Sequence, residues 1–99
     1  MTDLNVVAVI AAKPGSEDAV RDALRALVPP TRDEDGCISY NLYESASAPG
    51  TFVTVEAWRG QADLDAHMAS PHIAEVFKVA GEHLASQPAI HTLDPIVVD

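Results

Sequence analysis

The 99-residue sequence predicts an α+β fold of the ferredoxin-like, split βαβ type, with a four-stranded antiparallel sheet covered by helices on one face. Segments with strand and helix patterns follow one another in the order β-α-β-β-α-α-β. Hydrophobic residues make up 47% of the chain, which is enough for a core, and no apolar run approaches the about 18 residues of a membrane span. These observations indicate one domain over residues 1–99.

The first half of the predicted fold is a strand followed by a helix. Residues 4–12 are rich in β-branched side chains and end at a Pro-Gly pair, which predicts a strand. Ser16 offers an N-cap, and apolar residues then recur at helical spacing. The proline pair at 29–30 is expected to end or kink this helix, although residues 31–35 can add one more turn.

The centre of the chain predicts a β-hairpin from residues 37–45 and 51–59. In the first strand, alternation places Ile38, Tyr40 and Leu42 on one face. The second strand carries large side chains on both faces, with Val53, Val55 and Ala57 on one and Phe52, Thr54, Glu56 and Trp58 on the other. Helices cover only one face of such a sheet, and a second copy packed sheet to sheet would cover the other, so we expect a homodimer.

The second half of the chain predicts two helices and a final strand. Residues 61–69 form a short helix, and Ser70 caps a second helix that has Pro71 in its first turn. This helix is expected to continue until Pro88 stops it. Residues 89–98 form the last strand, and the proline within it indicates an edge strand or a bulge.

Charge, the N-terminal sequence and cysteine content limit the possible binding partners, the cellular location and the role of the cysteine. Six basic residues against fifteen acidic ones give a net charge of −9, which predicts no nucleic-acid and no membrane partner. An acidic residue precedes the N-terminal apolar run, where a secretory signal has basic ones, so we expect a cytoplasmic protein. The single cysteine, Cys37, excludes an internal disulfide and is expected to be a small buried hydrophobe, not a nucleophile.

The sequence contains no nucleotide-binding, P-loop, zinc-protease or serine-hydrolase motif. The first candidate catalytic residues are therefore two histidines, His67 and His72. Apolar neighbours on the same helical stripe turn His67 inward, and His72 follows across the Ser-Pro junction. Their spacing of five does not place both rings on one helical face, and Glu56 is the only attractive third ligand. We therefore predict no metal site and no cofactor.

A pocket between the sheet and the helices is predicted from the central strand. Glu56 and Trp58 share one face of this strand, so Trp58 could floor a pocket that Glu56 polarises, whereas a plainer alternative has Glu56 reaching solvent or an arginine. Asn5 either marks a strand start or projects toward the same pocket. Tyr40 is expected to bury its ring, and its hydroxyl needs a partner.

The ordered set of these residues resembles the antibiotic biosynthesis monooxygenase family. The similarity is tightest over residues 33–77, and its pattern comprises Glu34, Gly36, Cys37, Tyr40, Glu56, Trp58, His67, Ser70, Pro71 and His72. The resemblance implies a dimeric α+β barrel of two ferredoxin-like subunits. It also implies oxidation of phenols, anthrones or quinols to quinones by O₂ without flavin, haem or metal.

This resemblance implies roles for six residues in a site for a small aromatic substrate and O₂. The expected catalytic residues are His67, His72 and Glu56, and the expected substrate-binding residues are Trp58, Asn5 and Tyr40. Either histidine could move the proton, while Glu56 could orient the histidine or act as the base. Trp58 would contact the ring, and the other two would bond its oxygens.

Three alternatives stay open at the level of sequence. The chain could be a non-catalytic dimer that binds a small molecule. It could be an isomerase of a small phosphorylated signal molecule, although six basic residues suit phosphate poorly. Asn5 and Trp58 also fit a haem-degrading branch of the family, but Val76 stands near the position of that branch's iron-ligating histidine, which disfavours haem chemistry.

Overall fold

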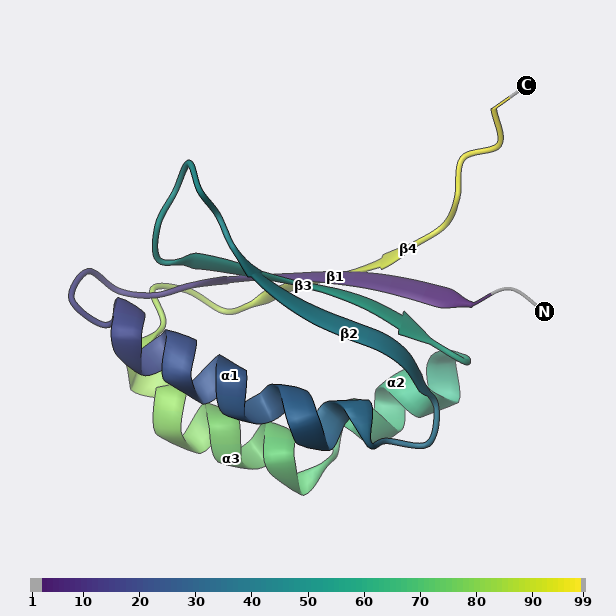
Figure 1. Cartoon of the computed structure of the whole chain (residues 1–99), viewed down its shortest axis with the longest axis horizontal. Helices are drawn as coiled ribbons and strands as arrows, with labels where there is room; N and C mark the ends of the chain where they lie inside the picture. Colours follow the sequence, from purple (N-terminus) through teal and green to yellow (C-terminus); the bar gives the residue numbers. More distant parts are fainter. Residues whose placement is uncertain (1–2, 99) are drawn as a thin grey trace.

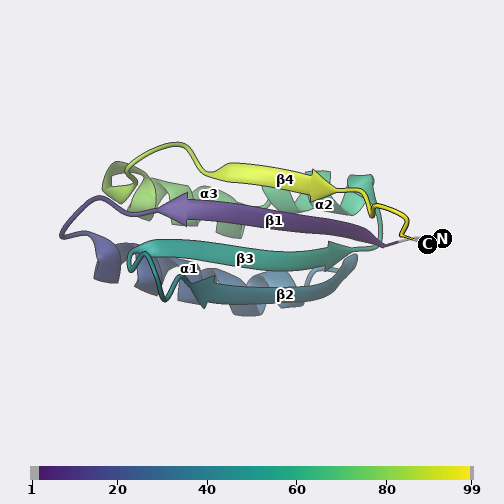
Figure 2. The ribbon, with the colours of Figure 1, turned by 90° about the horizontal axis from the view of Figure 1, so that it is seen from above.

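A four-stranded antiparallel sheet with its helices on one face forms the protein, as the sequence predicts (Figures 1 and 2). The computed structural model describes residues 3–98. The strand order is β2-β3-β1-β4, with β1 at Leu4–Ala11, β2 at Cys37–Glu44, β3 at Thr51–Trp58 and β4 at Ala89–Leu93. The helices are α1 at Glu17–Arg32, α2 at Gln61–Met68 and α3 at Pro71–Ala80. Within residues 3–98, no helix is both long and apolar enough to cross a bilayer.

The alternation predicted for β3 is confirmed. Its buried side chains are Phe52, Thr54, Glu56 and Trp58, which face the helices. The neighbouring strand β1 buries Val6, Ala8 and Ile10 on the same face. The apolar stripes of α1 and α3 pack against these side chains, so the core lies between the sheet and the helices.

A β-bulge at the start of β2 changes which residues face the core. The register against β3 shifts between Cys37 and Ser39, and Tyr40 then lies opposite Glu56. Tyr40 is buried as predicted. The prediction that Ile38 shares its face is wrong, because Ile38 is the extra residue at the bulge and is 53% exposed.

The proline pair does not end α1, which continues through Pro29 and Pro30 to Arg32. Neither proline has an N–H to donate, but the amide of Asp33 donates to the carbonyl of Pro29 at 3.2 Å and closes the following turn. Thr31 is fully buried in that turn. Packing of the last turn against the core therefore outweighs the two missing hydrogen bonds.

The C-terminal elements are shorter than predicted. Helix α3 ends at Ala80 instead of near Pro88, and a 3-10 turn, η1, follows at Gly81–His83. The glycine lowers helix propensity at this point. Strand β4 ends at Leu93 and lies at the edge of the sheet, as the proline after it predicts.

Candidate active site

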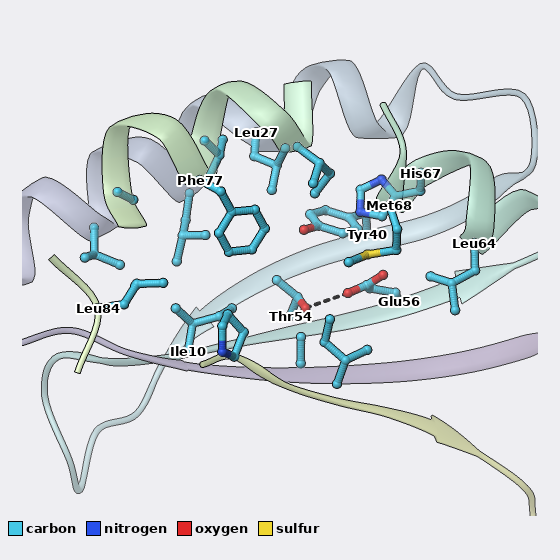
Figure 3. Close-up of a pocket in the computed structure, with 18 residues that line it drawn as sticks. Ile10, Leu27, Tyr40, Thr54, Glu56, Leu64, His67, Met68, Phe77 and Leu84 are labelled. Atoms are coloured by element: carbon cyan, nitrogen blue, oxygen red, sulfur yellow. Dashed lines mark hydrogen bonds between the residues drawn. The ribbon is translucent and has the colours of Figure 1, made fainter. Parts of the chain in front are cut away.

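A small cavity lies between the helix-facing side of the sheet and helices α1, α2 and α3 (Figure 3). Its volume is about 50 Å³, and apolar side chains form most of its wall. Four polar side chains contribute to the lining and come from β2, β3 and α2: Tyr40, Thr54, Glu56 and His67. An apolar cavity with a few convergent polar groups is the usual form of a small-molecule site.

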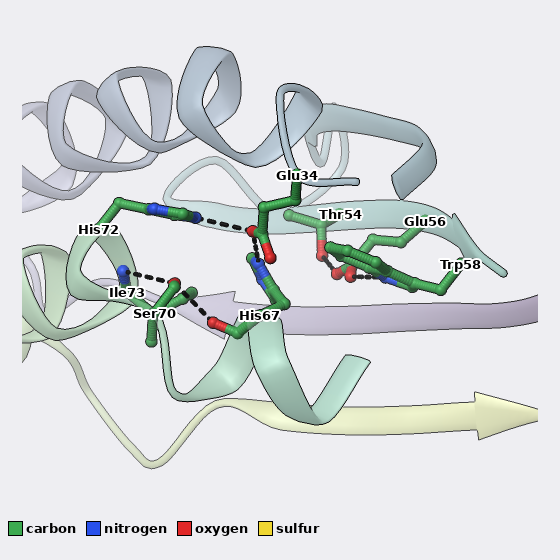
Figure 4. Close-up of polar contacts among 8 residues, drawn as sticks. All are labelled: Glu34, Thr54, Glu56, Trp58, His67, Ser70, His72 and Ile73. Atoms are coloured by element: carbon green, nitrogen blue, oxygen red, sulfur yellow. Dashed lines mark hydrogen bonds and ion pairs between the residues drawn. The ribbon is translucent and has the colours of Figure 1, made fainter. Parts of the chain in front are cut away.

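Glu56 is a buried carboxylate, with 5% of the residue exposed. Thr54 Oγ1 donates to Glu56 Oε2 at 2.6 Å, and Trp58 Nε1 donates to Glu56 Oε1 at 2.8 Å (Figure 4). The three side chains meet because residues two apart in a strand share a face. These bonds offset the cost of burying the charge. Glu56 thus reaches neither solvent nor an arginine, and it does not orient a histidine.

Trp58 lies behind the cavity and does not form its floor. The residue is fully buried, and its side chain is absent from the cavity lining. Its ring packs against His67, with the centroids 4.7 Å apart and the planes inclined by 38°. Trp58 therefore supports two residues of the lining, His67 through packing and Glu56 through a hydrogen bond.

Glu34 brings the two predicted histidines together. One oxygen, Glu34 Oε2, lies 2.6 Å from His67 Nδ1 and 2.7 Å from His72 Nε2 (Figure 4). His67 lies in the last turn of α2, whereas His72 lies in the first turn of α3. The rule that residues five apart do not share a helical face does not apply, because the two residues belong to different helices.

The junction between α2 and α3 is fixed by Ser70. Its hydroxyl donates to the carbonyl oxygen of His67 at 2.6 Å and accepts from the amide of Ile73 at 3.4 Å. Pro71 occupies the first turn of α3, where its missing N–H costs nothing. The predicted cap is confirmed, and it sets the relative placement of the two histidines.

The hydrogen bonds to Glu34 select a tautomer for His67. An ionised Glu34 has no proton to give, so His67 Nδ1–H and His72 Nε2–H both donate to it. His67 Nε2 then carries the lone pair, on a side chain that lines the cavity. This arrangement suits His67 to accept a proton from a bound molecule.

The sequence did not single out Glu34 as a partner of the histidines. It is the middle one of three acidic residues after α1, and its neighbours Asp33 and Asp35 are exposed while Glu34 is half-buried. The family pattern includes Glu34, but nothing in the local sequence indicates that it contacts a histidine. The contacts of Glu34 span 33 and 38 residues of sequence, so only the assembled fold shows them.

Tyr40 and Cys37 stay protonated in this environment. Burial, followed by the Glu56 charge, raises the pKa of Tyr40 far above its ordinary value. Burial, followed by the Glu34 charge, raises the pKa of the half-buried Cys37 thiol. Tyr40 can therefore donate a hydrogen bond into the cavity, and the thiolate form of Cys37 is disfavoured.

Asn5 lies on the other side of the sheet. It is exposed and pairs with Ala57, whereas its neighbour Val6 faces the helices and pairs with Glu56. The prediction that Asn5 projects toward the pocket is wrong for the cavity of this chain, because no bulge interrupts the alternation of β1.

Comparisons with known proteins agree with the fold. Residues 4–79 match the family model described as antibiotic biosynthesis monooxygenase. The Mycobacterium tuberculosis protein named "Putative monooxygenase Rv0793" is 41% identical over 91 residues, which cover 92% of this chain and 89% of that protein. Its solved structure superposes with a TM-score of 0.87 and 38% identity over 98% of both chains.

Two further proteins extend the comparison. The Escherichia coli K12 protein named "Probable quinol monooxygenase YgiN" is 32% identical over 80 residues, which cover 71% of this chain and 77% of that protein. The crystal structure of PA3566 from Pseudomonas aeruginosa has a TM-score of 0.90 and 32% identity, covering 98% of this chain and 97% of that one.

Proposed function

The chain belongs to the antibiotic biosynthesis monooxygenase family, and we propose that it is a cofactor-independent monooxygenase that oxidises a phenolic, anthrone or quinol-type substrate with O₂ to a quinone. The observation that carries the proposal is His67, which lines an apolar cavity while Glu34 holds its Nδ1. The names of the Rv0793 and YgiN relatives support the reaction class.

The proposed reaction draws all its reducing equivalents from the substrate. His67 Nε2 accepts the proton of the substrate hydroxyl, or of the anthrone carbon, and leaves an electron-rich anion. The anion passes one electron to O₂, and the two radicals combine at a ring carbon to give a peroxide. When that ring carbon carries a hydrogen atom, loss of water from the peroxide turns the carbon into a carbonyl and yields the quinone, which is a hydroxyquinone when the substrate is a quinol. One oxygen atom thus enters the product and the other leaves as water.

The residues around His67 divide the remaining work. Glu34 keeps the imidazole in the tautomer that accepts at Nε2, and His72 holds Glu34 from its other side. The Tyr40 hydroxyl donates to the substrate oxygen and stabilises the anion. Glu56 holds the side chains of Thr54 and Trp58 through one hydrogen bond on each of its oxygens, and we assign it no proton transfer.

An aromatic substrate needs more room than the cavity offers in this conformation. The volume of about 50 Å³ is well below the about 300 Å³ at which ligand pockets begin. Met68 and Phe77 line the cavity and are 40% and 37% exposed, so both side chains can turn outward. Methionine adapts readily to a new neighbour. We expect these two side chains to move when the ring binds.

The outer face of the sheet supports the proposal of a homodimer. Val55 on β3, Tyr43 on β2 and Leu93 on β4 are exposed large side chains, and the strand register places them on the face away from the helices. A second copy packed sheet to sheet would cover them. Light scattering of the purified protein should give twice the chain mass, and Val55→Lys should give a monomer.

Two features of the cavity weigh against the isomerase alternative. No lysine or arginine occurs among the described residues that line it, and the Glu56 carboxylate does line it. A phosphorylated ligand would be repelled by this carboxylate and would find no cation there. The cavity therefore fits a neutral aromatic molecule better than a phosphorylated one.

Oxygen uptake tests the proposal directly. EDTA-treated protein should consume O₂ faster than autoxidation with a panel of naphthols, naphthalene diols and anthrones, and should form the quinone. His67→Gln should lower kcat about 100-fold or more. His83→Gln is the matched control, because His83 bonds Ser16 away from the cavity, and it should behave as wild type.

Two experimental outcomes would refute the proposed monooxygenase reaction. Turnover in His67→Gln equal to that of the wild type would remove the base from the mechanism. Binding of these aromatics without any oxygen uptake would identify the chain as a non-catalytic small-molecule-binding protein instead.

A further inference from the structure

The cluster of Glu34, His67 and His72 has the composition of a metal centre, and we propose that it binds one divalent transition-metal ion, with zinc as the best fit (Figure 4). The three donors are a carboxylate oxygen, His67 Nδ1 and His72 Nε2, and all lie within 4.8 Å of one another. Binding of a metal at this cluster is independent of the oxygenase reaction and stands if that reaction fails.

The donor set selects the class of ion. Two imidazole nitrogens and one carboxylate oxygen are typical ligands of zinc and its first-row neighbours, whereas magnesium and calcium prefer oxygen ligands alone. Three protein ligands leave a fourth tetrahedral position open for water or another small ligand. The acidic chain, with a net charge of −9, also attracts cations.

All three ligand side chains must adjust to accept the ion. With metal–ligand distances of about 2.0–2.1 Å, tetrahedral donors lie about 3.3 Å apart. The Glu34 oxygen now lies 2.6 Å and 2.7 Å from the two nitrogens. Each of these two separations must therefore widen by about 0.6–0.7 Å, which rotation of the Glu34 side chain can supply, and the two histidine nitrogens, which lie within 4.8 Å of each other, must come to the same spacing.

The protein holds the three ligands in place from separate elements. Glu34 follows α1, while His67 and His72 lie on α2 and α3, whose junction Ser70 fixes by its two hydrogen bonds. Trp58 packs against the ring of His67. Such support reduces the entropy lost on binding and distinguishes the cluster from histidines that meet by chance on a surface.

An ion can reach the cluster from the solvent side. The His67 side chain is buried, but those of His72 and Glu34 are 20% and 16% exposed. The two accessible ligands can capture the ion before His67 completes the site. No large opening of the core is required.

Metal binding would oppose the proton transfer of the proposed function. Ligation through Nδ1 moves the ring proton of His67 to Nε2, and this nitrogen can then no longer accept a proton from a substrate. We expect zinc to inhibit the oxygenase for this reason. This consequence rests on the proposed function, but the site itself does not.

Direct binding measurements test the site. The full chain is treated with EDTA, dialysed, and titrated with ZnCl₂ by calorimetry and with CoCl₂ by visible absorption. We expect one ion per chain and the intense d–d bands of four-coordinate cobalt. Loss of even an outer partner of a metal ligand costs about 10–100-fold in affinity, so Glu34→Gln and His72→Ala should each weaken binding at least about 100-fold.

The controls keep failure of folding apart from loss of the site. His83→Ala removes a histidine outside the cluster and should bind zinc as the wild type does. Circular dichroism identifies unfolded variants, and His72→Gln replaces His72→Ala if the latter is unfolded. Binding that is absent in the wild type, or unchanged in the Glu34 and His72 variants, would overturn the proposal. Oxygen uptake is not a readout, so the two proposals can fail separately.

Discussion

Thr54→Val removes the hydroxyl that donates to the buried Glu56 carboxylate and keeps nearly the same side-chain shape. Thr54 is fully buried on β3, and its Oγ1 lies 2.6 Å from Glu56 Oε2. The oxygen that loses this donor cannot turn to water, since Glu56 is only 5% exposed. We expect the variant to be destabilised by one charge-assisted hydrogen bond.

The size of the effect follows from the environment of the carboxylate. Hydrogen bonds to charged groups contribute about 1.5–3 kcal/mol. Glu56 keeps its second donor, the indole of Trp58, at 2.8 Å. The free energy of unfolding should therefore fall by about 2 kcal/mol, within this range and short of the cost of an unpaired buried charge.

Urea denaturation measures the loss. Trp58 is the only tryptophan, so its fluorescence reports unfolding, with circular dichroism as a second probe. Protein concentration is held fixed, because an oligomer makes stability depend on it. Thr51→Val is the control on the same strand: the Thr51 hydroxyl has no hydrogen bond within the described residues, so its loss should change stability by less than about 0.5 kcal/mol.

A double-mutant cycle decides whether the lost bond is the cause. In a Glu56→Met background the Thr54 hydroxyl has no carboxylate to donate to, so Thr54→Val should leave the free energy of unfolding unchanged or raise it slightly. A coupling energy below about 0.5 kcal/mol would refute the reasoning, as would an unchanged stability of Thr54→Val in the wild-type background.

Three further predictions concern the ion pair of Arg21 and Glu44, the thiol of Cys37, and Gly36, which lies close to the Asp63 side chain. The hydrogen bond from Arg21 lowers the pKa of Glu44, so this pair stabilises the fold above the ordinary glutamate pKa, and the gain is lost as pH falls through the lowered value. The melting temperature of Arg21→Ala should therefore be lower than that of the wild type at neutral pH, and the two should converge in strong acid. A difference in melting temperature that does not change with pH would contradict this. The raised pKa of Cys37 should make its alkylation by iodoacetamide at neutral pH slower in the folded than in the urea-unfolded chain, which mass spectrometry measures; equal rates would rule out the burial effect. In Gly36→Ala the added carbon collides with the Asp63 side chain, so we expect the free energy of unfolding in urea to fall by about 1–3 kcal/mol. Adding Asp63→Ala should restore part of this loss. An unchanged free energy of unfolding would mean that the loop moves at little cost to accept the methyl group.

The sequence predicts the faces of the strands well where alternation is unbroken and fails where the register changes. On β3, the period of two correctly places Glu56 beside Trp58 on the helix-facing side. On β2, the same rule misplaces Ile38, because the bulge depends on pairing with a distant strand. Alternation is a local property, whereas register is set by the partner strand.

Helix ends are predicted poorly for a related reason. The proline pair has a strong local preference to stop α1, yet the turn after it continues and buries Thr31 completely. Tertiary packing decided that boundary. The cap of α3 at Ser70, by contrast, rests on a bond to the amide of Ile73 three residues away, and local sequence suffices to predict it.

The candidate site divides in the same way. The inward orientation of His67 can be predicted from its neighbours on the same helical face, because spacing along α2 is local information. The partner of His67 could not be predicted, because Glu34 is 33 residues away and the family pattern that includes it gives it no contact with a histidine. The sequence suggested Glu56 instead, which the structure binds to Thr54 and Trp58.

His72→Ala separates the base from the metal site, because a single oxygen of Glu34 serves two imidazoles. The variant removes one metal ligand but leaves the bond between Glu34 and His67 Nδ1, which sets the tautomer of the base. Zinc affinity should fall at least about 100-fold, while kcat should fall by no more than about tenfold. Glu34→Gln should impair both. A His72→Ala variant that loses turnover as severely as His67→Gln would show that His72 itself moves the proton, and the assignment of His67 as the base would be wrong.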